Sequence, residues 1–188
     1  ISHNLKKIDF FGGEPFLNVS HLELLEAMEH PEDIVLFYST NCTNFPTDRL
    51  KRAWNKFKKI EISMSIDGTE ERFELLRHPG KWAKALEVIE AIDALKNELD
   101  CEVYTMGSLT VSAMNVFDVD NIYNWHKDRG DVYINMVQSP AYLSIARMPD
   151  HIKELVRQQV TNSEVLGYLD VDSFDSTTWE QFKIWMTR

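Results

Sequence analysis

A carboxylate follows two glycines at the end of a short apolar run near the start of the chain. The three residues are Gly12, Gly13 and Glu14. Because glycine has no side chain, a ligand can approach the backbone closely, and Glu14 offers a carboxylate to a cationic group. Strand-to-helix turns also favour glycine and proline, so this motif alone does not separate a ligand site from an ordinary turn.

Polar side chains recur where later predicted strands end. They are Asn41, Ser65, Asp67, Asn115 and Asn135. The carboxyl ends of parallel strands are where barrel-like folds assemble ligand sites from several loops, and buried polar groups are costly unless they are paired. A turn or helix-capping role for Asp67 and a local Asx-turn for Asn41 are alternatives that the sequence leaves open. Taken together, the pattern favours a ligand site.

Strands alternating with amphipathic helices must position these residues, which predicts an α/β fold around a parallel sheet. The predicted strands cover 8–11, 34–39, 60–66, a segment within 102–111, and 132–137. Helices are predicted over 81–96 and 118–127. The pair Thr178 and Gln181 resembles a capping box, which predicts a last helix after Thr178.

The third predicted strand alternates apolar and polar residues. Ile60, Ile62 and Met64 share one face, while Ser63 and Ser65 share the other. Since the helix that follows needs an apolar sheet surface, the serines are expected to face away from the helices. In a barrel that direction is the lumen, whose carboxyl-end mouth holds the functional site.

Composition restricts the classes of function. The chain has 188 residues, with 20 Lys and Arg against 30 Asp and Glu, a net charge of −10. That charge disfavours binding to nucleic acid or to acidic membrane surfaces. The only two cysteines, Cys42 and Cys101, form no disulfide framework and no cysteine metal motif, so we expect a reducing, cytoplasmic location. The basic run within 49–59 is interpreted as a solvated face.

Three motifs in order resemble the radical S-adenosylmethionine (SAM) enzymes: IDFFGGEPFL, then STN, then SMSIDG. The resemblance implies a partial barrel of βα units with SAM at its mouth. The glycines and Glu14 would lie at the methionine amino group, Ser65 and Asp67 near the ribose, and the last two strands near ribose and adenine. The implied cofactor-binding residues are Gly12, Gly13, Glu14, Asn41, Ser65, Asp67, Asn115 and Asn135.

Two further segments resemble the SPASM/twitch branch of that superfamily: ERFELLRHPGKWAKALEVI and NMVQSPAYLSIARMPDHIKE. Arg77, in the first segment, matches a recurrent arginine of this branch, which implies contact with the cofactor or with a substrate carboxylate. An ordinary ion pair is the alternative for Arg77. The substrate, a small molecule or a peptide, is not specified by these residues.

The family needs a CxxxCxxC loop that holds a four-iron four-sulfur cluster, and this sequence has none. We therefore expect a chain truncated at its N-terminus, and also at its C-terminus, that is inactive alone. The expected fold is a partial (β/α)6-type TIM-like barrel without its first βα unit, residues 1–140, followed by a short helical, twitch-like extension, residues 141–188. The intact enzyme would take electrons from an external donor. Alternatives are a non-catalytic SAM-binding module and an unrelated TIM-type barrel enzyme.

Overall fold

A computed structural model describes residues 5–18 and 20–187 and contains one five-stranded, all-parallel sheet. Its spatial order follows the chain order, β1-β2-β3-β4-β5. The strands are β1 (Lys7–Phe10), β2 (Val35–Thr40), β3 (Lys59–Ser65), β4 (Glu102–Val111) and β5 (Asp131–Met136). The predicted α/β class and the five predicted strands are confirmed to within one or two residues at most ends.

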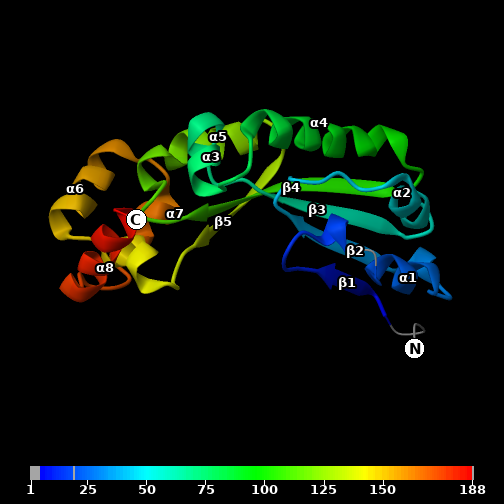
Figure 1. Ribbon diagram of the computed structural model, residues 1–188, viewed down its shortest axis with the longest axis horizontal. Coiled ribbons are helices and arrows are strands. Elements are labelled where there is room, and N and C mark those ends of the chain that lie inside the picture. The colour runs from blue at the N-terminus through cyan, green and yellow to red at the C-terminus, as the bar shows by residue number, and fades with distance from the viewer. Residues whose placement is uncertain (1–4, 19, 188) are drawn as a thin grey trace.

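Helices connect successive strands and continue beyond the last one (Figure 1). They are α1 (Ser20–Glu26), α2 (Asp48–Trp54), α3 (Glu70–Leu76), α4 (Trp82–Glu98), α5 (Val119–Lys127), α6 (Asp150–Gln159), α7 (Ser163–Tyr168) and α8 (Ser176–Met186). In Figure 1, α4 runs along the sheet, while α6 and α8 lie at the opposite end of the molecule from α1 and α2. Consecutive parallel strands joined by helices are the arrangement of a partial TIM-like fold.

Side-chain capping fixes where several helices begin. The Thr47 hydroxyl accepts a hydrogen bond from the Leu50 amide, 3.3 Å away, at the start of α2. The last helix starts three residues earlier than the sequence predicts, because the Asp175 carboxylate accepts the amide hydrogens of Thr177 and Thr178. A carboxylate competes well for these free amides, so the capping box predicted at Thr178 is wrong.

The strand register separates a helix-covered face from an open face. On the covered face, Leu36 is paired with Ile60, and Tyr38 with Ile62; all four side chains are fully buried. The other face, which we call the open face because no helix of the described residues covers it, carries the alternate residues, among them Ser63 as predicted, although Ser63 is itself only 5% exposed. The alternation of β3 therefore assigns its two faces correctly.

Two apolar cores hold the helices against the sheet. The first lies under α1, α2 and α4 and has Trp54 at its centre, with its indole Nε1 donating to the Tyr38 hydroxyl at 3.0 Å. The second joins β4 and α5 to the C-terminal helices and includes Leu109, Ile122 and Val156. The predicted boundary between 140 and 141 stays a prediction.

Candidate functional site

The carboxyl ends of the strands meet at one edge of the sheet because all the strands are parallel. At the end of β1, Gly12 and Gly13 adopt φ angles of +83° and +56°. Side chains other than glycine rarely adopt such angles. A Cβ added at either residue would meet no atom within 4 Å. The two glycines thus turn the chain and leave open space beside their backbone.

Glu14 is anchored to the end of the neighbouring strand. Its carboxylate accepts the Thr40 hydroxyl, 2.9 Å from each oxygen, and the amide of Asn41, also at 2.9 Å. The Phe16 amide donates a third proton, at 3.3 Å. A carboxylate offers about four lone-pair sites, so these three protons orient Glu14 and leave acceptor capacity for a cationic ligand.

Burial raises the pKa of the Glu14 carboxyl, and the hydrogen bonds from Asn41, Thr40 and Phe16 oppose that effect. Thr40 is itself buried and is not among the site residues predicted from the sequence. The signal was present, because Thr40 is the middle residue of the STN motif and belongs to the covered, alternating face of β2. We call Glu14, Thr40 and Asn41 the Glu14 group.

Asp67 joins the ends of β3 and β4. One carboxylate oxygen accepts the Thr110 amide at 2.8 Å, and the other forms an ion pair with Arg77. The Asp67 side chain is 14% exposed and the Arg77 side chain is 29% exposed, so the ion pair is partly accessible to solvent. Arg77 therefore makes the ion pair that was the alternative to a ligand contact, and among the described residues its other side-chain donors have no hydrogen-bond partner.

Asn115 completes this connection from the loop after β4. Its side-chain amide donates to the backbone carbonyls of Asp67 and Thr110, both at 2.9 Å. Its side-chain oxygen accepts the Ser112 amide at 2.8 Å. Because Asn115 is only 3% exposed, these contacts occupy it fully. We call Asp67, Arg77, Thr110 and Asn115 the Asp67 group.

The remaining candidates lie on the open face or in a local turn. Ser65 lies 3.5 Å from the Ser39 hydroxyl, oxygen to oxygen, and Asn135 is exposed beside Thr110 in the register. Within the described residues the Asn135 side chain has no hydrogen-bond partner. The Asn41 side chain accepts the amide and hydroxyl of Thr43, at 3.0 and 2.6 Å, as in the Asx-turn alternative.

The predicted site residues therefore fall into two bonded groups at one edge of the sheet. The Glu14 group spans the ends of β1 and β2, and the Asp67 group spans β3 and β4. Ser65 lies on the open face of β3, and Asn135 on the same face of β5. Acceptors and donors thus follow five successive strands along one edge of the sheet.

The cysteines do not contribute to a metal site in the described part of the chain. No group of three or more histidine, cysteine, aspartate or glutamate side chains there could hold a metal ion. Cys42 is fully buried, and burial raises the pKa of its thiol. Between residues 5 and 187, leaving out residue 19, no helix has both the length and the apolar character needed to cross a membrane.

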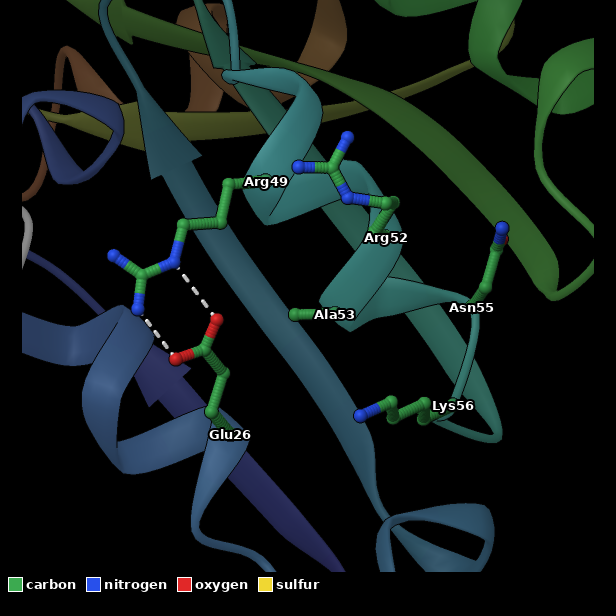
Figure 2. A pocket seen from close by; sticks show the side chains of 6 residues that line it. All are labelled: Glu26, Arg49, Arg52, Ala53, Asn55 and Lys56. Carbon is green, nitrogen blue, oxygen red and sulfur yellow. Dashed lines mark hydrogen bonds and ion pairs between the residues drawn. The ribbon is translucent and has the colours of Figure 1, made fainter.

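One cavity lies between α1 and α2, and a second lies next to the Glu14 group. A cavity of about 580 Å³ is lined by Glu26, Arg49, Arg52, Ala53, Asn55 and Lys56. Figure 2 shows Arg49 turned toward Glu26, to which its Nε donates at 2.9 Å, while Arg52 and Lys56 point apart. A cavity of about 250 Å³ borders Cys42 and Thr43, next to the Glu14 group.

Comparisons with known proteins give a fold relationship. No protein-family model and no curated protein sequence matches the chain. Among solved structures, native anSMEcpe with bound AdoMet matches with a TM-score of 0.55 and 20% identity, over 72% of this chain and 38% of that one. The complex of anSMEcpe with AdoMet and the Cp18Cys peptide matches with a TM-score of 0.53 and 18% identity, over 74% and 42%. The chain therefore shares the fold of about two fifths of anSMEcpe.

Proposed function

We propose that the chain binds SAM along the carboxyl edge of its sheet, as part of a radical SAM enzyme of the SPASM/twitch branch. The observation that carries this proposal is the Glu14 group, an oriented carboxylate beside two glycines that leave open space. The shared fold supports it, because anSMEcpe is a radical SAM enzyme and its matching structures hold AdoMet.

The Glu14 group fits the methionine end of SAM. An ammonium group donates three hydrogen bonds and carries a positive charge. An oriented carboxylate with a free lone pair can accept one of these hydrogen bonds and offset the charge. Gly12 and Gly13 let the methionine part approach the backbone without steric conflict. In this proposal Thr40 and the Asn41 backbone hold the carboxylate in place before the ligand arrives.

The other end of the site fits the nucleoside. Ser65 and Asn135 supply a hydroxyl and an amide on the open face, suited to the ribose and the adenine edge. Asp67 and Asn115 are assigned to the same part of the ligand, with Asn115 acting through the backbone of Asp67. Arg77, already oriented by Asp67, is assigned to a carboxylate of the cofactor or substrate.

The reaction is proposed for the whole protein, since this chain matches only about two fifths of the length of anSMEcpe. The two cysteines of this chain are too few to hold a four-iron four-sulfur cluster in the way that a CxxxCxxC loop does. In the intact protein, a cluster held by other residues would supply the electron for the reductive cleavage of SAM that leads to hydrogen-atom abstraction from the substrate. We propose a small molecule or a peptide as substrate, since anSMEcpe has been solved with peptides, and an external electron donor in the cytoplasm.

Calorimetric titration of the chain with SAM tests the proposal. Wild-type protein should bind SAM, and Glu14→Gln should weaken binding about tenfold or more, because the substitution removes a charge-assisted hydrogen bond. Glu90→Gln is the matched control, since Glu90 is exposed on α4, and it should leave the affinity unchanged. Absence of binding by the wild type, or equal affinity of the two variants, would refute the proposal.

A further inference from the structure

We infer that His126, a residue outside the predicted site, is a positioning residue that holds the end of β3 in the geometry the SAM site needs. His126 lies in the last turn of α5 and is 2% exposed. Its ring Nε2 lies 2.8 Å from the backbone carbonyl oxygen of Ile66, the residue that directly follows β3. A helix on the covered face therefore contacts the strand end next to Asp67.

The sequence makes room for this contact at Gly107 in β4. A Cβ at Gly107 would lie less than 3.0 Å from three atoms of the His126 ring, so any other residue would displace the imidazole. Gly107 is paired with Met64 of β3 in the register, and the Ile66 amide donates to Ser108 at 3.2 Å. The His126 ring thus packs over Gly107, the one residue of β4 without a side chain, and reaches the end of β3 on the other side of β4.

The protonation state of His126 follows from its partner. A carbonyl oxygen only accepts, so Nε2 must carry the hydrogen. Burial lowers the pKa of His126, which favours the neutral ring with its proton on Nε2. The other charged groups that act on the ring are Asp67, which raises the pKa, and Arg129, which lowers it. The contact is therefore a neutral hydrogen bond that persists at physiological pH.

His126 and Asn115 hold two consecutive carbonyls. His126 donates to that of Ile66, and Asn115 donates to that of Asp67. Fixing both peptide planes sets the direction of the Asp67 side chain, whose oxygens bind the Thr110 amide and Arg77. Ser65, one residue before this pair, is set on the open face by the same constraint. The inferred consequence for SAM rests on the proposed function.

Three variants separate positioning from general stability. His126→Leu removes the donor, while His126→Gln keeps one, since a glutamine Nε2 is as many bonds from the backbone as the histidine Nε2. Ile122→Ala is the matched control: Ile122 is fully buried one turn earlier in α5, and its truncation loosens the same helix without touching Ile66. The denaturation midpoint of each variant shows whether it is folded under the conditions of the exchange and binding measurements.

The first readout is amide hydrogen exchange of the free protein, which needs no ligand. The amides of Ile66 and Thr110 report on the strand end, since they donate to Ser108 and to the Asp67 carboxylate. Relative to the global stability of each variant, His126→Leu should speed exchange at both amides by about tenfold, and His126→Gln should restore most of the protection. Equal exchange in His126→Leu and Ile122→Ala would overturn the inference.

The second readout is SAM affinity by calorimetry. His126→Leu should weaken it by about tenfold, with His126→Gln close to wild type and Ile122→Ala unchanged. If the wild type binds no SAM, the proposed function fails, and the exchange data alone decide whether His126 positions the strand end. If SAM binds but His126→Leu binds it as well as Ile122→Ala does, the positioning role is refuted and the proposed function stands.

Discussion

Three asparagine-to-alanine substitutions at one edge of the sheet should differ widely in their cost, although the residue type and the change are the same. Asn115 is 3% exposed, and its side chain satisfies two backbone carbonyls and one backbone amide. Within the described residues, the half-buried Asn41 side chain accepts hydrogen bonds only from its near neighbour Thr43. The Asn135 side chain is exposed and makes no hydrogen bond within the described residues.

Asn115→Ala leaves three buried backbone groups without partners, and each such group costs about 1 to 3 kcal/mol, less where water enters. We expect a loss of about 3 kcal/mol in unfolding free energy, equivalent to a midpoint lower by roughly 6 to 12 °C. Asn41→Ala should cost less than about 1 kcal/mol. Asn135→Ala should stay within about 0.5 kcal/mol of wild type.

Urea denaturation followed by far-ultraviolet circular dichroism measures all three variants, with comparable m-values as the condition for comparing midpoints. The order Asn115, Asn41, Asn135 is the expected result. If Asn115→Ala costs no more than Asn41→Ala, its hydrogen bonds do not hold the ends of β3 and β4 together, and the description of the Asp67 group is wrong.

Three further predictions concern the thiols, the carboxylate and the turn. A thiol-specific reagent should label the half-buried Cys101 in native protein and Cys42 only after denaturant is added, as read by mass spectrometry; equal rates would contradict the burial of Cys42. Because burial raises the pKa of Glu14, which must be ionised to bind an ammonium group, SAM affinity should fall with falling pH, and the fall should begin at a higher pH than for an ordinary glutamate. Calorimetry should show this fall in the wild type but a much flatter profile in Glu14→Gln, and parallel profiles would exclude Glu14 as the responsible group. Gly13→Ala should lose about 1 to 2 kcal/mol in urea denaturation because its φ is +56°. Gly167→Ala, in α7 with equally open surroundings, should lose nothing, and equal costs would contradict the strained turn.

The strands could be predicted because their patterns are local. Alternation in 60–66 identified the covered and open faces of β3, and apolar runs identified the other strands. The start of α8 could not be predicted by the same means, because two capping signals lie three residues apart and the Asp175 carboxylate takes the free amides.

The site was predicted as a set of strand-end residues, but its internal bonding was not. Thr40 and His126 escaped notice because their partners, Glu14 and Ile66, lie 26 and 60 residues away in the sequence. Strand pairing brings Glu14 and Thr40 together, and the packing of α5 on the sheet brings His126 to Ile66. The contact between Gly107 and His126 could not be predicted for the same reason, since a glycine inside a strand does not reveal which side chain packs over it.

Backbone amide shifts during a titration with SAM test the central claim most directly, because they report where on the chain the ligand binds. If SAM binds at the carboxyl edge of the sheet, the largest shifts are expected at Gly12, Gly13 and the Asn41 amide, with further shifts near Ser65 and Asn135. Shifts centred instead on Arg52 and Lys56, in the cavity between α1 and α2, would place the ligand elsewhere and contradict the account (Figure 2). No saturable shift at any amide would contradict it as well.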